Sequence, residues 1–259
     1  MKKKQQYITD CGGIQPVPIP EHAATATHTP KEENKMKKQG NNLTELVFIL
    51  DRSGSMHGLE ADTIGGFNSM LEKQKRLEGE ALVTTVLFDD EVELLHDRLP
   101  LSRVKPLTRE DYTVRGCTAL LDTVGDTVSR IGTVHKYARA EDRPAHTVFV
   151  ITTDGMENAS RRYTAEQVRS MINRQQERYG WEFIFLGANI DAVHTAAGLG
   201  IRADRAANYH ADAKGTAVIY DDIDCLLEVL RTNEPSAPAV GSEWKARIDA
   251  DFAARRSER

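Results

Sequence analysis

The sequence predicts an α/β domain built on a doubly wound, mainly parallel sheet, with helices on both faces and one antiparallel edge strand. Continuous apolar runs alternate along the chain with stretches of helical periodicity, which is the pattern of parallel strands joined by crossover helices. The apolar runs contain few polar residues, as expected for strands buried on both faces. A length of 259 residues, 40% of them hydrophobic and 28% charged, suits one sizeable soluble domain.

Four apolar runs are predicted to be strands of this sheet, because each is short and is bounded by polar residues. They are Leu46–Leu50, Ala81–Phe88, Thr147–Thr152 and Trp181–Leu186. The pair Asp89-Asp90 predicts a tight turn into a fifth strand over residues 92–95. This strand would form a hairpin with the one before it and supply the antiparallel edge.

A helix is expected after the first strand, because apolar residues recur on one face: Leu59, Ile64, Phe67, Met70 and Leu71. Gly65 and Gly66 lower the intrinsic stability of this helix, so we interpret them as sites of close packing.

Four more helices are expected further along the chain. Thr164 and Gln167 have the spacing of a capping box, which predicts a helix from that point through Tyr179. Asn189 and Asp191 are interpreted as residues that cap a short helix ending at Leu199. The other two helices are expected over residues 118–131 and 214–230.

The chain divides by texture into three parts. Residues 1–42 are predicted to be a disordered extension, because they are polar, contain prolines and show no periodicity. Met36 is a second candidate start of translation within this part. The domain is expected over residues 43–232, and residues 233–259 are predicted to be a polar, charged tail.

Charge and cysteine content narrow the class of protein. A net charge of −5 gives no general reason to expect nucleic acid or an anionic membrane as a partner. The three cysteines, Cys11, Cys117 and Cys225, lack the spacing of a metal knuckle or a disulfide framework. The basic N-terminus is not followed by the apolar segment of a signal peptide, and no apolar stretch is long enough to span a membrane. We therefore expect a cytoplasmic protein.

Oxygen-bearing side chains follow two of the predicted strands. Asp51, Ser53 and Ser55 come directly after the first strand, in the pattern D-x-S-x-S, and Asp154 comes after the Thr147–Thr152 strand. Thr118 opens the helix predicted between them. Each fragment alone is typical of a helix cap. Together they bring hydroxyls and carboxylates to one edge of a parallel sheet, which is where ligands of such sheets gather.

This set of ligands favours a hard divalent cation. Oxygen donors without nearby histidine or cysteine suit a small octahedral ion that retains water, so Mg²⁺ is expected, with Mn²⁺ or Ca²⁺ as alternatives. Gly54 allows the loop to curl so that Ser53 and Ser55 point the same way.

The arrangement resembles the von Willebrand factor A (VWA) domain and its metal-ion-dependent adhesion site, over roughly residues 43–232. The resemblance implies the strand order 3-2-1-4-5-6. It also implies that Ser53 and Ser55 coordinate the metal directly, and that Asp51 and Asp154 bind directly or through water. Thr118 would coordinate directly or move away with conformational state.

Several residues around the predicted site carry secondary interpretations. Cys117 departs from the family pattern, in which small residues are more usual at this position. We interpret it as a small filler, with a redox role as the alternative. His57 is interpreted as a solvated loop residue, because one soft ligand adds little to a hard site. The residues expected on the rim are Met56, His57, Arg115, Met156, Glu157, Asn158 and Arg161.

The leading hypothesis is a protein-binding module whose metal captures an Asp or Glu carboxylate of a partner. A Mg²⁺-dependent hydrolase is the first alternative, but no histidine or lysine is obviously placed as a base, and Ser53 lacks the G-x-S-x-G pattern of a nucleophile elbow. We therefore do not expect an enzyme. A scaffold that self-associates through its metal is the second alternative.

Overall fold

The computed structural model describes residues 42–232 and 240–256. They form a sheet of six strands in the order β3-β2-β1-β4-β5-β6, which confirms the predicted order 3-2-1-4-5-6. β3 pairs antiparallel with β2, and the other neighbouring strands pair in parallel. The strands are β1 Thr44–Asp51, β2 Ala81–Phe88, β3 Val92–Pro100, β4 His146–Thr153, β5 Glu182–Ala188 and β6 Ala206–Tyr209. Residues 1–42 were predicted to be disordered; all of them except Asn42 lie outside the described ranges.

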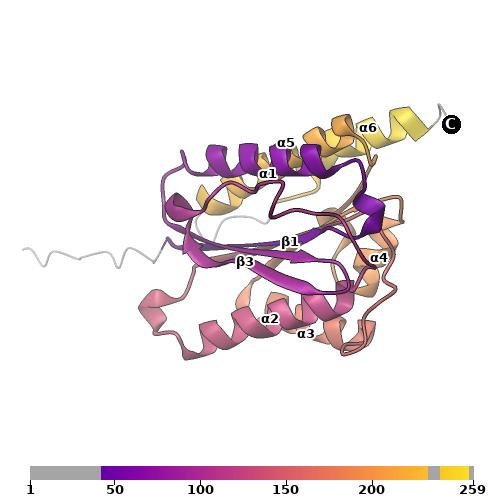
Figure 1. The fold of residues 1–259 in the computed structure, drawn as a ribbon. Helices are drawn as coiled ribbons and strands as arrows, with labels where there is room; N and C mark the ends of the chain where they lie inside the picture. The colour runs from indigo at the N-terminus through magenta and orange to yellow at the C-terminus, as the bar shows by residue number, and fades with distance from the viewer. Residues whose placement is uncertain (1–41, 233–239, 257–259) are drawn as a thin grey trace, which may run out of the picture. The chain divides into compact units, whose positions relative to one another are not determined.

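Helices cover both faces of the sheet, as Figure 1 shows: α1 and α5 lie on one face, and α2 and α3 on the other. The helices are α1 Glu60–Gln74, α2 Leu120–Tyr137, α3 Ala165–Tyr179, α4 Ala192–Gly198, α5 Ala213–Thr232 and α6 Ala246–Arg256. None of the helices within the described ranges is long and apolar enough to cross a lipid bilayer.

Alternation along β1 explains why the sheet needs two helical layers. Leu46, Phe48 and Leu50 pack into the core beneath α1 and α5, whereas Val47 and Ile49 pack into the core beneath α2 and α3. All five side chains are almost fully buried. A strand that buries both of its faces reads as a continuous apolar run, which is the pattern seen in the sequence.

Local signals set several helix boundaries. Thr164 and Gln167 form the predicted capping box: the Gln167 amide donates to Thr164 Oγ1 at 3.3 Å, and the Thr164 amide donates to Gln167 Oε1 at 2.8 Å. Gly180 ends α3 with φ of 65°, a left-handed conformation that glycine adopts without steric cost. Asp191 caps α4 by accepting the His194 amide, as expected.

Two elements differ from the sequence-based expectations. β6, which the pattern analysis missed, has the sequence Ala-Ala-Asn-Tyr and lacks β-branched residues. It exists because β5 offers a parallel edge and α5 covers Tyr209. The segment expected to be a polar tail contains α6, which packs on α5 and β6 and buries Ile248. A helix with one buried anchor carries too weak an apolar pattern to be recognised alone.

Gly66 is the one of the two α1 glycines that close packing requires. A Cβ on Gly66 would overlap the buried ring of Tyr220 on α5, whereas a Cβ on Gly65 would meet nothing within 4 Å. The interpretation of close packing therefore holds for Gly66 and not for Gly65.

We expect Gly66→Ala and Gly65→Ala to change stability in opposite directions. Overlap with Tyr220 should cost Gly66→Ala roughly 1–3 kcal/mol of unfolding free energy. Gly65→Ala should gain up to about 1 kcal/mol, because alanine favours an exposed helix interior. Urea unfolding followed by circular dichroism measures both changes. Equal effects of the two substitutions would contradict the packing argument.

Candidate metal centre

The five predicted residues lie together at the carboxyl ends of the central strands. Asp51 is the last residue of β1, and Ser53 and Ser55 belong to the loop that follows it. Asp154 directly follows β4, the neighbour of β1 in the sheet. Thr118 stands in the loop before α2, which begins at Leu120 and not at Thr118 as expected.

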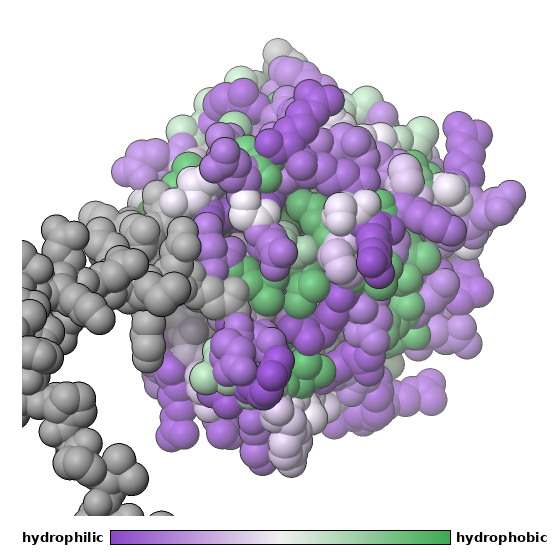
Figure 2. Space-filling model, turned by 90° about the vertical axis from the view of Figure 1, so that its left-hand side faces the viewer, coloured by the Kyte–Doolittle hydropathy of each residue, from purple (hydrophilic) through white to green (hydrophobic). Residues whose placement is uncertain are grey.

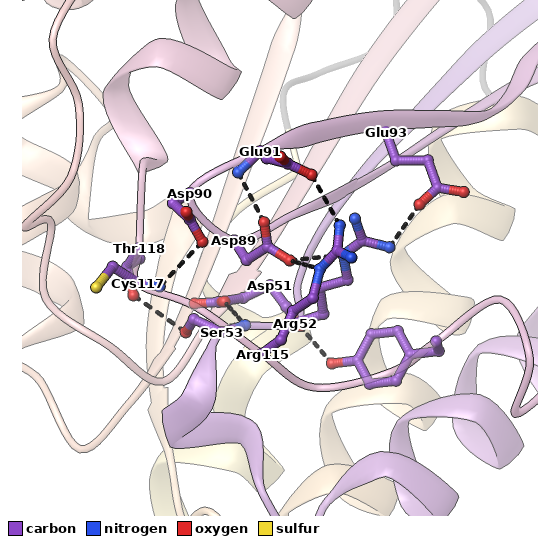
Figure 3. Close-up of polar contacts among 11 residues, drawn as sticks. Asp51, Arg52, Ser53, Asp89, Asp90, Glu91, Glu93, Arg115, Cys117 and Thr118 are labelled. Carbon is purple, nitrogen blue, oxygen red and sulfur yellow. Dashed lines mark hydrogen bonds and ion pairs between the residues drawn. The ribbon is translucent and has the colours of Figure 1, made fainter.

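A chain of short oxygen–oxygen contacts joins these residues. Ser55 Oγ donates to Asp154 Oδ1 at 2.5 Å and lies 3.1 Å from Ser53 Oγ. Thr118 Oγ1 donates to Ser53 Oγ at 3.0 Å, a contact drawn in Figure 3. Asp51 Oδ1 accepts the Ser53 amide at 2.7 Å. Side chains up to 103 positions apart, from Asp51 to Asp154, thus meet at one place.

The three hydroxyl oxygens surround a point beside Gly155. A Cβ built on Gly155 would lie 2.9 Å from Thr118 Oγ1, 3.0 Å from Ser55 Oγ and 3.7 Å from Ser53 Oγ. A side chain at this position would therefore crowd the three hydroxyl oxygens, whereas glycine leaves the space between them open. Asp154 Oδ2 is buried here and accepts no hydrogen bond from any residue that the structure describes.

Burial dominates the protonation of the two carboxylates. Desolvation raises the pKa of Asp51 to about 6, opposed by hydrogen bonds from the Thr153 hydroxyl and from Ser53, and the nearby charge of Asp154 raises it further. Desolvation also raises the pKa of Asp154, against the hydrogen bond from Ser55. Both groups would hold their charge more readily beside a cation.

Basic partners distinguish these two carboxylates from the other buried acids. Arg98 and His135 contact Glu45, while Arg52 and Arg115 contact Asp89. Arg162 contacts Asp122, and Arg247 contacts Asp222. Within the described residues, Asp51 and Asp154 are the buried acids that form no ion pair.

Asp89 ties the loops of the site together, as Figure 3 shows. Its Oδ2 accepts Arg52 Nε at 3.1 Å and Arg115 Nε at 2.8 Å. Its backbone oxygen accepts the Ala119 amide at 2.8 Å, next to Thr118. Arg52 also donates to Glu93 on β3 at 2.6 Å. This network connects the loop of Ser53 to the loop of Thr118 without using either site carboxylate.

Sequence reasoning missed these supporting roles, although it placed Arg115 and Asn158 on the rim. Tyr112, fully buried, donates its hydroxyl to the Asp51 backbone oxygen, and Thr153 donates to the Asp51 carboxylate. Asn158 Oδ1 accepts the Thr118 amide at 2.8 Å. One signal was present in the sequence: Asp89 follows the second strand directly, just as Asp51 follows the first.

The residues expected on the rim have mixed outcomes. Met56 is buried in the core, so its assignment to the rim was wrong, because the loop turns it inward under α1. His57 is solvated as expected, with its side chain 87% exposed. Met156 is 75% exposed at the rim. Cys117, which we interpreted as a small filler, is exposed and lines the cleft beside the site.

Glu157 has a structural role that the sequence did not indicate. Its carboxylate accepts the Leu121 amide at the start of α2 and the amides of Ala159 and Ser160 in its own loop. It therefore holds the loop after Asp154 against α2.

A cleft of about 950 Å³ lies beside the site. Cys117 and Asn158 line it next to the metal residues, Asp90 lines one wall, and Arg161 lines another. None of the five predicted metal residues lines this cleft, so it adjoins the site as a neighbouring surface.

Solved structures of other proteins are similar to this chain in fold. The sequence matches no protein-family model and no curated protein. The structure is similar to proximal thread matrix protein 1 from the mussel byssus, with a TM-score of 0.49 and 13% identity over 72% of this chain. This chain covers 46% of that protein, less than half of its length. Another structure of the mussel protein is described as having a zinc-occupied MIDAS motif.

Two further solved structures are similar at the same level. A von Willebrand factor type A protein from Catenulispora acidiphila has a TM-score of 0.46 and 14% identity, covering 70% of this chain and 41% of that one. Manganese-loaded TRAP protein from Plasmodium vivax has a TM-score of 0.47 and 14% identity, covering 69% of this chain and 72% of that one. The strand order of this chain is the one that the VWA resemblance implies.

The raised pKa of Asp51 predicts a pH-dependent stability in the metal-free protein. The folded protein holds this proton up to about pH 6, whereas an unfolded aspartate loses it near pH 4. The contribution of protonated Asp51 is therefore present at pH 4 and lost as pH rises through 6, by roughly 3 kcal/mol.

Comparison with Asp51→Asn isolates this group from the other carboxylates. In EDTA, the unfolding free energy of Asp51→Asn relative to wild type should rise between pH 4.5 and 7.5. Added Mg²⁺ should remove this difference at pH 7.5, because the cation favours the charged carboxylate. A difference that stays constant with pH in EDTA would contradict the desolvation of Asp51.

Proposed function

We propose that Asp51, Ser53, Ser55, Thr118 and Asp154 hold a divalent cation, Mg²⁺ by the chemistry of the donors, and that this cation binds an acidic residue of a partner protein. One observation carries the proposal. Two carboxylates are buried together without a basic partner among the described residues, although each of the other buried acids has one. An uncompensated buried charge costs several kcal/mol, and a cation would offset that cost.

The donors suit a hard ion. Every side-chain donor is oxygen, and the three hydroxyls already lie around one point beside Gly155. The orphaned Asp154 Oδ2 supplies a further lone pair in the same place. Mg²⁺ retains several waters and binds through few carboxylates, which fits two carboxylates and three neutral hydroxyls. Mn²⁺ and Ca²⁺ have the same preference for oxygen and would compete for the site.

Charge balance explains why such a site would bind proteins. Two carboxylates neutralise a divalent ion and the hydroxyls add no charge, so the ion keeps its affinity for one more anionic oxygen. A carboxylate from a partner Asp or Glu would displace a bound water and form a strong, localised bond. The adjoining cleft and the exposed Met156 supply a surface for the rest of the partner.

Binding, not catalysis, is the role that we propose for this centre. Among the described residues that hydrogen-bond to the five donors, none is a histidine or a lysine. A hydrolase would need a base or nucleophile beside the metal. We further propose that the protein acts in the cytoplasm, in accordance with the free thiols of Cys117 and Cys225.

Metal binding should depend on the site residues. In isothermal titration calorimetry at pH 7.5, EDTA-treated wild type should bind one Mg²⁺ or Mn²⁺ per chain. Asp154→Ala should abolish detectable binding, and Ser55→Ala should weaken it about tenfold or more, by analogy with losses at other metal sites. Asp90→Asn removes an exposed carboxylate at the same end of the sheet and serves as the matched control. Equal loss in all three variants would contradict the assignment.

Partner capture should require both the metal and a carboxylate. The full chain immobilised with Mg²⁺ should retain from lysate a protein that is lost with EDTA and with Asp51→Ala. Substitution of one Asp or Glu of that partner by Ala should then abolish binding to the wild-type chain. Retention of every partner by the Asp51→Ala variant would overturn the proposed mechanism. Light scattering with and without EDTA checks the scaffold alternative, which predicts a smaller molar mass in EDTA.

A further inference from the structure

A second cleft, of about 520 Å³, lies between α2 and α3 at the opposite end of the sheet from the metal centre. Thr147 near the start of β4 and Trp181 just before β5 line it, whereas Asp154 follows the other end of β4. Figure 2 shows the molecule from the side where the strands begin, with hydrophobic residues gathered in the middle of the face among hydrophilic ones.

The lining of this cleft is cationic, in a chain whose net charge is −5. Lys136, Arg143 and Arg174 line it, and none of the described residues that line it is acidic. Lys136 and Arg174 form no ion pair with a described residue, and Arg143 Nε donates to the Ala138 backbone oxygen at 3.2 Å. Three cations thus surround one concave surface without a carboxylate among its walls.

Helix dipoles account for only part of this charge. Lys136 lies in the last turn of α2, where a cation interacts favourably with the helix C-terminus. Arg174 lies before the last turn of α3, and the cation in that last turn is Arg178. Arg143 lies in the loop before β4. Its Nε donates to the backbone oxygen of Ala138, the C-cap of α2, so Arg174 is the one of these three cations that no helix end explains.

Aromatic rings form the remaining walls. Trp181 is 5% exposed and stacks on Phe149 at a centroid distance of 5.4 Å, which fixes its position. His135 packs edge-on against Trp181 and lies 3.0 Å from the buried Glu45 carboxylate, so its polar edge is engaged by the protein. Tyr179 is 59% exposed, which leaves a ring face for an incoming planar group.

We propose that this cleft binds a small phosphate-bearing aromatic ligand of the mononucleotide class. Guanidinium groups match the geometry of phosphate oxygens, and Arg174, Arg143 and Lys136 would share the phosphate charge. Tyr179 and Trp181 would contact the planar base, since aromatic side chains stack on bases without selecting among them. The cleft volume lies within the range of small-ligand pockets, roughly 300–1,000 Å³.

Isothermal titration calorimetry with the full chain, in EDTA, tests this proposal separately from the metal centre. The probes are AMP, ribose 5-phosphate, adenosine and inorganic phosphate. We expect saturable binding of AMP, with ribose 5-phosphate and adenosine each at least about tenfold weaker, because each lacks one of the two recognised groups. The Asp51→Ala variant should bind AMP as wild type does, even if the metal proposal fails.

Matched variants locate the site. Arg174→Ala should weaken AMP binding about tenfold or more through loss of a charge-assisted hydrogen bond. Arg169→Ala removes the same charge from an exposed position on α3 beside Gly200, outside the cleft, and should leave the affinity within about twofold, as expected for a distant exposed charge. Ser129→Leu fills the cleft from an exposed position on α2 without changing its charge, and should also weaken binding.

Four outcomes would overturn the proposal. The first is absence of saturable AMP binding at millimolar concentration, and the second is equal affinity for AMP and inorganic phosphate. The third is equal weakening by Arg174→Ala and Arg169→Ala. The fourth is binding of a single-stranded RNA without binding of AMP, which would point to a polymer and not to a mononucleotide. Circular dichroism of each variant confirms that the fold is retained.

Discussion

The buried carboxylate of Asp51 is the constraint on which the rest of the site depends. It lies at the end of the central strand β1, and desolvation raises its pKa to about 6. Asp154 follows the neighbouring strand β4, so the parallel pairing brings a second desolvated carboxylate to the same place. Two like charges in a region of low dielectric favour either protonation or a bound cation. The arrangement is thus unfavourable for the metal-free chain at neutral pH.

A separate ion-pair network around Asp89 holds the surrounding loops in place. Arg52 stands in the sequence between Asp51, the last residue of β1, and Ser53. Its side chain nevertheless donates to Asp89 and Glu93 and forms no ion pair with Asp51. Asp89 in turn accepts Arg115 and holds the loop before α2. Because Arg52 and Arg115 form ion pairs with Asp89 and Glu93, they do not neutralise the Asp51 and Asp154 carboxylates, which can therefore bind a cation. Such preorganisation reduces the entropy that a ligand must overcome on binding.

The parallel sheet gives its two ends different chemistry. At the carboxyl ends, the loops present hydroxyls and carboxylates around Gly155. Near the amino ends of β4 and β5, α2 and α3 converge on a cleft lined by arginine, lysine and aromatic residues. The two proposed ligands, a cation and an anion, therefore meet surfaces of opposite character. The eight residues of β4 separate the two ends of the sheet. A substitution in one site therefore does not touch the residues of the other site.

The sequence alone determined the elements that depend on local pattern. The continuous apolar run of β1 reflects burial on both faces, and the Thr164–Gln167 pair starts α3 through hydrogen bonds between near neighbours. The D-x-S-x-S pattern with Thr118 and Asp154 also identified the candidate ligands, because parallel strands bring their carboxyl ends to one edge.

Tertiary structure decided whatever depends on contacts between distant segments. β6 forms on the edge that β5 offers, and α6 is held by packing on α5, although neither has a strong pattern of its own. Gly66 and Gly65 are indistinguishable in the sequence, and only the ring of Tyr220 separates them. Likewise, among the described residues, the lack of a basic partner at Asp51 and Asp154 follows from the positions of the basic side chains in space, because ion pairing depends on distance and not on sequence separation.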